Sequence, residues 1–259
     1  MGDVTGVGLG VPGQVNPESG VVRMAVNLNL SSFPLGMALA GRLRTHVSVE
    51  NDVRLAALGL YHHLRQQRPL ESLAYVSVGT GIAAGIVDDG VLLRGANGMA
   101  GEIGHMVFDP TGERCLCGLH GCLETIVSGP AIARQAASFF NGEDRELTSA
   151  DVYAAAIAGN LQAQQLVQRV SVYLARALHW LVMSYDVEQI ILGGGVAGAG
   201  EPFWQPILSE LSIMCEQSTL ARTMLPQGKI SLFSGTENPG IWGATFLAQQ
   251  VTGRVHPVS

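Results

Sequence analysis

Short apolar runs alternate with longer helical patterns along most of the chain. Runs that predict strands cover residues 4–11, 47–50, 73–78, 82–87, 91–93, 189–192 and 229–233. Patterns that predict helices cover residues 31–43, 53–66, 129–140, 148–159, 161–185, 201–217 and 239–251. Residues 14–22 predict a hairpin, and residues 27–32 predict a loop. Strands that alternate with helices indicate an α/β fold with partly parallel sheets.

Composition gives this pattern enough apolar material for a large core. Of 259 residues, 47% are hydrophobic and 14% are charged, which predicts one large domain or two modest ones. No period of about 20–50 residues repeats, so a solenoid is not expected.

The charge balance narrows the possible partners. The formal net charge is −6 and no run is rich in Lys or Arg, so we expect no nucleic-acid binding by this chain itself. The N-terminus lacks the basic region of a signal peptide, and residues 170–185 are interrupted by Arg176 and His179. We therefore expect a cytoplasmic protein with no membrane association, in which clustered cysteines are metal ligands rather than disulfides.

Residues 100–124 hold three of the four cysteines. His105, Cys115, Cys117 and Cys122 offer nitrogen and sulfur donors, which bind zinc at about 2.0–2.3 Å in closed tetrahedral sites. Glycines between the cysteines let the backbone fold tightly. The stretch predicts a structural zinc site.

Three carboxylates near this stretch and near residue 52 could contact a ligand. Asp52 follows an expected strand and could act as a general base, although the Asn51-Asp52 pair could equally cap the following helix. Glu102 and Glu124 could accept hydrogen bonds from sugar hydroxyls, or they could balance charge around the metal. One nitrogen of His105 could bind zinc while the other contacts a ligand.

Two glycine-rich turns could approach a phosphate. The turn Gly79-Thr80-Gly81 between two strands is either a plain hairpin turn or a phosphate loop. The run Gly193-Gly194-Gly195 after a buried strand favours a nucleotide. Its spacing is not that of a dinucleotide fingerprint, which argues against NAD.

The order of several segments resembles the ROK family (repressors, open reading frames, kinases). These segments are GVGLGVPGQV, NLNL, ENDV, VSVGTGIAAGIVDDG, GEIGH, CLCGLHGCLE and ILGGG. The resemblance covers nearly the whole chain. It implies an actin-like, ribonuclease-H-like fold of two lobes, with residues 1–73 as part of the first lobe and 74–259 as the second. The zinc loop would be 100–124, and the helix 239–251 would pack back on the first lobe.

The resemblance also implies roles for individual residues. Asp52 matches the catalytic base of the kinases and a sugar ligand in both branches. The other sugar-contacting positions would be Asn27, Asn51, Glu102, His105 and Glu124. Thr80 and Gly81 match the second phosphate loop, and Gly193 and Gly194 match the loop on the adenosine side. His105, Cys115, Cys117 and Cys122 match the zinc ligands, and the family implies a homodimer or higher homo-oligomer.

Departures from the family pattern decide the expected function. The chain has neither a D-x-G-G-T phosphate loop nor a helix-turn-helix before Gly6, which predicts an incomplete first lobe. Its amino-acid sequence, including the segment LLRGA, resembles the regulators of the family more than the kinases. We therefore expect the sugar-sensing domain of a ROK transcriptional regulator, with DNA bound through a missing N-terminal domain.

Two alternatives remain open. One is an ATP-dependent hexose or N-acylhexosamine kinase lacking its first phosphate loop, with ATP and Mg²⁺ as cofactors and Asp52 as base. The other is a zinc-stabilised structural protein without a ligand.

Overall fold

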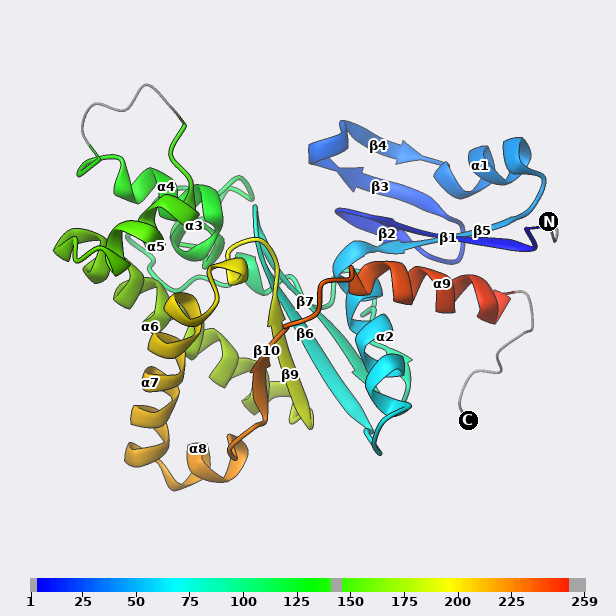
Figure 1. Ribbon diagram of the computed structural model, residues 1–259. Helices are drawn as coiled ribbons and strands as arrows, with labels where there is room; N and C mark the ends of the chain where they lie inside the picture. The colour runs from blue at the N-terminus through cyan, green and yellow to red at the C-terminus, as the bar shows by residue number, and fades with distance from the viewer. Residues whose placement is uncertain (1–3, 141–145, 252–259) are drawn as a thin grey trace. The chain divides into compact units, whose positions relative to one another are not determined.

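The computed structural model describes residues 4–140 and 146–251, which form two compact units (Figure 1). Unit 1 consists of Met1–Tyr75, Ala84–Gly101 and Ser234–Ser259, and unit 2 of Val76–Ala83 and Glu102–Phe233. The units interleave in sequence, because unit 1 contains three separate segments of the chain. The alternation of strands and helices confirms the α/β class.

The described residues of unit 1 form two small sheets and three helices, and they also contribute to a larger sheet described below. Strands β1 (Gly6–Val11) and β5 (His46–Asn51) pair in parallel. Strands β2 (Gln14–Asn16), β3 (Val21–Ala25) and β4 (Leu30–Phe33) form an antiparallel sheet. The helices are α1 (Leu35–Leu43), α2 (Asp52–Arg65) and α9 (Pro239–Val251).

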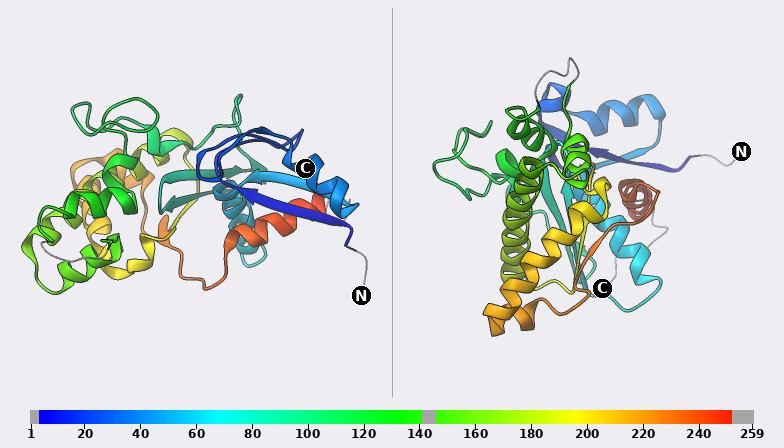
Figure 2. Two further views of the ribbon diagram at one scale, coloured as in Figure 1. Left: turned by 90° about the horizontal axis from the view of Figure 1, so that it is seen from above. Right: turned by 60° about the vertical axis from the view of Figure 1, so that its left-hand side comes forward.

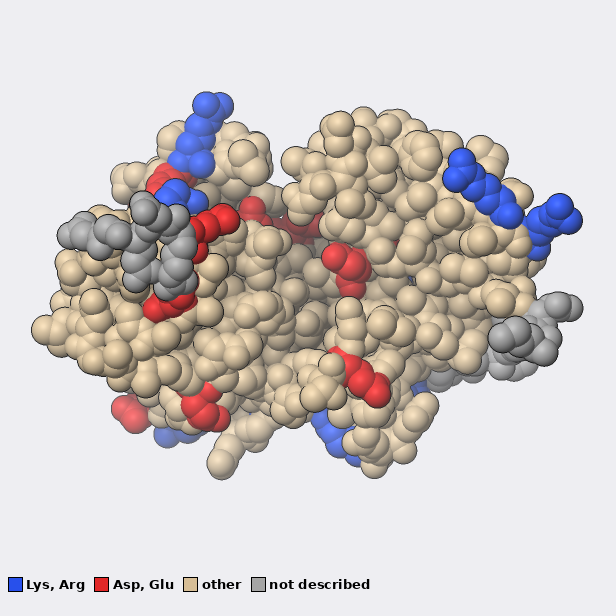
Figure 3. Space-filling model, turned by 45° about the horizontal axis from the view of Figure 1, so that its top comes forward, with Lys and Arg blue, Asp and Glu red and all other residues tan. Residues whose placement is uncertain are grey.

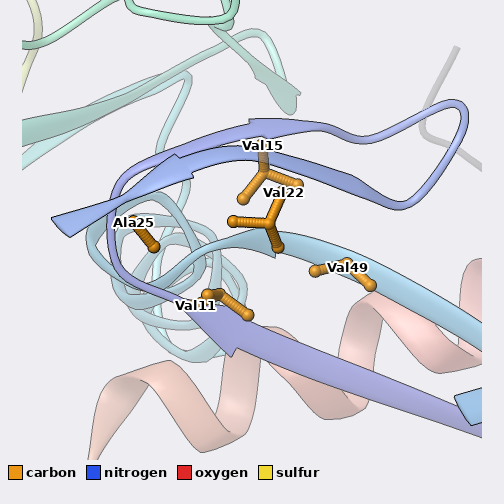
Figure 4. Close-up of a cluster of buried hydrophobic side chains, with 5 residues drawn as sticks. All are labelled: Val11, Val15, Val22, Ala25 and Val49. Carbon is orange, nitrogen blue, oxygen red and sulfur yellow. The ribbon is translucent and has the colours of Figure 1, made fainter. Parts of the chain in front are cut away.

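A cluster of small aliphatic side chains joins the two sheets of unit 1 (Figure 4). Val15 and Val22 face each other across β2 and β3, and both are fully buried. Val11 and Val49 reach the same cluster from the parallel strands. β-branched residues pack well on pleated surfaces, so these valines fix how the sheets stack.

The loop expected at residues 27–32 is wrong, and the helix expected from residue 31 begins later. Asn29 adopts a left-handed conformation with φ 51°, which ends a short 3₁₀ turn (Val26–Leu28) and reverses the chain. Residues 30–33 then pair with β3 as β4. Helix α1 therefore begins only after Pro34.

Helix α9 crosses α2 at very short range, and both views of unit 1 show them together (Figures 1 and 2). A Cβ on Gly243 would lie 1.8 Å from the Leu55 carbonyl oxygen. A Cβ on Gly59 would lie 2.2 Å from the Pro239 carbonyl oxygen. Glycine at both positions is what permits this contact.

Unit 2 is built mainly of helices. They are α3 (Glu124–Val127), α4 (Gly129–Ala136), α5 (Ser149–Ile157), α6 (Leu161–Tyr185), α7 (Glu201–Gln217) and α8 (Thr219–Met224), with 3₁₀ turns at Ile103–His105 and Ala197–Ala199. Leu166, Val170, Leu174 and Leu178 recur every four residues on α6 and are buried. This spacing places them on one helix face, where α5 and α7 pack.

A five-stranded sheet has the order β10-β9-β6-β7-β8. Its strands are β6 (Ser72–Val78), β7 (Ile82–Asp88), β8 (Val91–Leu92), β9 (Gln189–Gly193) and β10 (Ile230–Leu232). β10 and β9 pair in parallel, while β7 and β8 form a hairpin. The turn between β6 and β7 belongs to unit 2.

Within the described part of the chain, no helix combines the length and apolarity needed to cross a membrane.

His62 makes unit 1 sensitive to acid. Its ring stacks on Phe246 of α9, and burial, followed by the charge of Arg65, lowers its pKa from 6.5 to about 4. In the unfolded chain this histidine is protonated below about pH 6.5, whereas in the folded chain it is protonated only below about pH 4. The free energy of unfolding therefore decreases as the pH falls through this window.

We expect the melting temperature of His62→Gln to fall less between pH 6.5 and 4 than that of the parent chain. Thermal melts across this range test it, with the exposed His46→Gln as control; parallel slopes for His62→Gln and the parent would contradict it.

Candidate functional site

The β5–α2 junction presents one carboxylate and uses its neighbour as a helix cap. The Asn51 side chain accepts a hydrogen bond from the Arg54 backbone N–H at 3.1 Å and donates one to the Gly13 carbonyl at 3.1 Å. The capping interpretation is thus confirmed for Asn51. Asp52 is exposed at the first position of α2, and its Oδ1 accepts a hydrogen bond from the Val53 N–H at 2.9 Å. Its carboxylate lies where the helix dipole favours negative charge.

Asn27 also lies in unit 1, in the 3₁₀ turn between β3 and β4, where its side chain is exposed.

Sequence reasoning missed a buried group of charges directly behind Asn51. Glu50 and Arg54 are 0% and 2% exposed, and Glu50 forms ion pairs with both Arg54 and Arg94. A charged residue directly before the Asn-Asp pair was the only sequence signal.

In unit 2, the structure brings four metal-binding side chains together. The ligand atoms of His105, Cys115, Cys117 and Cys122, here named the His/Cys cluster, all lie within 4.8 Å of one another. His105 Nδ1 is 3.5 Å from Cys115 Sγ, and Cys117 Sγ is 3.5 Å from Cys122 Sγ. Tetrahedral zinc with sulfur ligands needs separations of about 3.8 Å. The donor set and spacing therefore fit such an ion.

Two glycines and a backbone hydrogen bond shape the loop that carries these thiols. Gly118 and Gly121 have φ of +97° and +67°, and a Cβ on Gly121 would lie 1.4 Å from the Asp109 carbonyl oxygen. The Cys115 N–H donates to the Leu119 carbonyl at 2.7 Å. Burial raises the pKa of the Cys122 thiol to about 12, while a backbone hydrogen bond at Leu119 lowers the pKa of Cys117. A bound cation would hold such thiols deprotonated.

Glu102 and Glu124, the two predicted sugar-binding carboxylates of unit 2, lie close to this cluster in the chain and have different contacts. Glu102 precedes the 3₁₀ turn that ends at His105, and the His105 N–H donates to its carbonyl at 3.2 Å. Glu124 begins α3, and its Oε2 accepts a hydrogen bond from the Ile82 N–H at 3.2 Å. Glu124 is therefore tied to the residue that follows the Gly79-Thr80-Gly81 turn. Because Nδ1 of His105 faces the thiols, its Nε2 is the nitrogen that the cluster does not use.

The two glycine-rich turns meet in unit 2 at a cavity of about 730 Å³. The Gly129 N–H donates to the Gly79 carbonyl at 2.7 Å, and the Val196 N–H donates to the Val78 carbonyl at 2.9 Å. The residues around the opening include Gly79, Thr80, Pro130, Arg134, Ser149 and Gly195. Of the predicted phosphate-loop and nucleotide residues, Thr80 lines the cavity, whereas Gly81, Gly193 and Gly194 do not. A concave, largely apolar space with a few polar groups is typical of a small-molecule site.

Gly194 packs directly against the Val78 backbone, next to the cavity residue Gly195. Its φ is +91°, and a Cβ there would lie 2.5 Å from the Val78 carbonyl oxygen, whereas a Cβ on Gly195 would meet open space. We expect Gly194→Ala to lose about 2–4 kcal/mol of unfolding free energy, because strain and overpacking add, and Gly195→Ala to lose almost none. Urea denaturation of both variants tests this. Equal losses would contradict the assigned contact.

Charges on the surface are sparse. Figure 3 shows the basic side chains of the described residues on one face as isolated groups rather than a continuous patch. The half-exposed pair Arg134–Glu113 lies on unit 2, and Arg134 also lines the cavity.

Comparisons with known proteins place this site in context. A model of the ROK family matches residues 1–251. A glucokinase of Halalkalibacterium halodurans is 37% identical over 218 residues, which are 79% of this chain and 66% of that enzyme. An N-acetylmannosamine kinase of Citrobacter koseri is 32% identical over 90% of this chain and 78% of that protein. The crystal structure of a ROK family transcriptional regulator, a homologue of the Escherichia coli MLC protein, superposes with a TM-score of 0.82 at 30% identity, covering 96% of this chain and 63% of that one. The chain thus spans about two thirds of the length of the glucokinase.

Proposed function

We propose that this chain, which belongs to the ROK family and has its actin-like ATPase fold, takes part in the ATP-dependent phosphorylation of a hexose or an N-acylhexosamine. The observation that supports the enzyme over the regulator is the cavity between Thr80 and Gly195. A cavity of about 730 Å³ beside two glycine-rich turns accommodates a nucleotide. A chain that only senses a sugar does not need such a cavity.

The side chains divide the proposed reaction between them. Asp52 accepts the proton of the attacking sugar hydroxyl, because it is the exposed carboxylate at the start of α2. Glu102, Glu124 and Nε2 of His105 orient sugar hydroxyls through hydrogen bonds. Asn51 holds the junction, since both ends of its amide are bonded to backbone. Asn27 belongs to the same set by its match to the family motif.

The remaining groups serve the nucleotide and the fold. ATP with Mg²⁺ supplies the phosphoryl group. Gly79, Thr80 and Gly195, which line the cavity, receive its phosphates and adenosine. Gly81, Gly193 and Gly194 belong to the same two loops by their match to the family motifs. The His/Cys cluster holds a structural zinc ion that keeps His105 in place, because a closed set of four ligands leaves no open position for chemistry. A homodimer or higher homo-oligomer is part of this proposal.

A second candidate is the sugar-binding domain of a transcriptional regulator. The superposition on the ROK regulator over 96% of this chain favours it. In that case the same side chains bind a sugar, and no phosphoryl transfer follows.

Nucleotide binding separates the two candidates. We expect Mg²⁺ with the ATP analogue AMP-PNP to raise the melting temperature, and D-glucose or N-acetyl-D-mannosamine to stimulate ADP release from ATP. Gly195→Leu should abolish the nucleotide effect, because its side chain would enter the cavity, whereas Gly198→Leu, also with open space around its Cβ, should not. Stabilisation by a sugar without any nucleotide effect would exclude the kinase and favour the regulator.

A further inference from the structure

Three charged side chains of unit 1 form a buried group behind the β5–α2 junction. Glu50 Oε1 accepts hydrogen bonds from Arg54 Nη1 at 3.2 Å and from the Asn51 N–H at 2.9 Å. Glu50 Oε2 accepts one from Arg94 Nε at 2.6 Å. The Glu50 and Arg54 side chains are 0% and 2% exposed, and Arg94 reaches them from a position that is 36% exposed. We name this group the Glu50 cluster.

Stability alone is a poor explanation for this cluster. A buried ion pair gains little over apolar residues of the same volume, because each charge loses its hydration. Arg54 adds to that cost, since its buried Nε has no hydrogen-bond partner among the described residues. Because the buried charges add little to the free energy of unfolding, the cluster points to a role that apolar side chains could not fill.

The cluster joins two segments that are 44 residues apart in the chain. Arg54 Nη2 donates to the Gly98 carbonyl, and Arg94 bonds to Glu50, so the segment 94–101 is held at two points. This segment includes three glycines with positive φ, at 95, 98 and 101. Such backbone has many alternative conformations when it is not held. The next residue in the chain is Glu102.

The other end of the cluster surrounds Asp52. The backbone of Asn51 bonds to Glu50, its side chain caps the Arg54 N–H, and the Arg54 guanidinium returns to Glu50. Together these three contacts form a closed ring of hydrogen bonds that links residues 50, 51 and 54. Asp52 is the exposed residue between Asn51 and Arg54, which are both buried and take part in these contacts.

We infer that Glu50, Arg54 and Arg94 are positioning residues, which fix Asp52 and the segment 94–101 leading to Glu102 as one preorganised half of the ligand site. This inference rests on the proposed function for the identity of the ligand, and on the contacts of unit 1 alone for the positioning. Rigid support of this kind raises affinity, because less ordering is left to do on binding.

Substitution of Arg94 tests the inference, because its partial exposure leaves the core of unit 1 filled. We compare Arg94→Met, which removes the charge, with Arg94→Lys, which keeps one donor, and with Arg42→Met at an exposed position of α1. Hydrogen–deuterium exchange of the whole chain gives the first readout. In Arg94→Met, exchange should accelerate by at least about tenfold at residues 51–55 and 94–101, the effect of one lost charge-assisted hydrogen bond. Exchange in α9 and α6 should stay unchanged.

Affinity for a sugar gives the second readout, measured by calorimetry with D-glucose and N-acetyl-D-mannosamine at a temperature where every variant is folded. For the sugar that the parent binds, Arg94→Met should weaken binding by about tenfold, Arg94→Lys should restore part of it, and Arg42→Met should change nothing. A lower melting temperature with unchanged affinity, or faster exchange spread evenly over unit 1, would overturn the positioning role. If the parent binds neither sugar, the proposed substrate class fails, and the exchange pattern alone decides the inference.

Discussion

Exhaustive chelation is expected to lower the melting temperature of this protein by about 10 °C. Structural zinc contributes folding free energy directly, and a loss of about 3–5 kcal/mol corresponds to roughly this shift in a chain of this size. The loss should be large because the His/Cys cluster cross-links loop 106–123. The backbone hydrogen bonds of this loop that span many residues mostly join loop residues to each other, so they do not anchor the loop to the rest of unit 2. Calorimetry before and after treatment with 1,10-phenanthroline measures the effect, and added Zn²⁺ should reverse it.

A pair of cysteine variants provides the control. Cys117 is an exposed member of the cluster, so Cys117→Ser removes a ligand without opening a cavity in the core. Cys215 lies on α7, apart from the cluster, and Cys215→Ser should keep the metal content of the parent. A parent chain that contains no zinc by mass spectrometry, or that melts unchanged after chelation, would show that the cluster is not a structural metal site.

The substitution Asp52→Asn is expected to reduce sugar phosphorylation by about 10²–10⁴-fold, because an amide cannot accept the hydroxyl proton. Asn is close to Asp in size, and Asp52 is exposed, so the fold should not change. Sugar affinity should also fall through loss of a charge-assisted hydrogen bond. Coupled ADP release and calorimetry measure the two effects separately.

The matched control is Asp89→Asn in the β7–β8 turn. Asp89 has φ 46°, a conformation that Asn tolerates well, and it follows β7 rather than a strand that leads into the site. Its turnover and affinity should equal those of the parent. Unchanged turnover in Asp52→Asn would remove Asp52 as the base, whereas turnover lost with intact affinity would restrict its role to the chemical step.

Elements with complete local signals were predictable from sequence. Helix α6 runs over Leu161–Tyr185 as expected, since Asn160 caps its first N–H groups and Asp186 ends it in a left-handed conformation. Strand β4 was not predictable, because it depends on the backbone of Asn29 and on pairing with β3. Local composition contained neither fact.

The site divides in the same way. The members of the His/Cys cluster lie within 18 residues of each other, and the sequence suggested their grouping before the structure brought them together. The contact between Glu124 and the Ile82 N–H, and the ion pair between Arg94 and Glu50, each join residues more than 40 positions apart. Neither leaves a spacing pattern, so only the folded chain reveals them.

The close crossing of α2 and α9 has a consequence for protein synthesis. The ribosome delivers residues 4–101 early and helix α9 only after residues 102–233, so α2 and β1 must remain uncovered while unit 2 is translated. Residues 102–233 can fold during this interval, because domains generally fold as units while the chain is being made. The apolar surface that α9 will cover stays exposed to solvent until then. The arrival of α9 is therefore the event that protects this part of the nascent chain from aggregation.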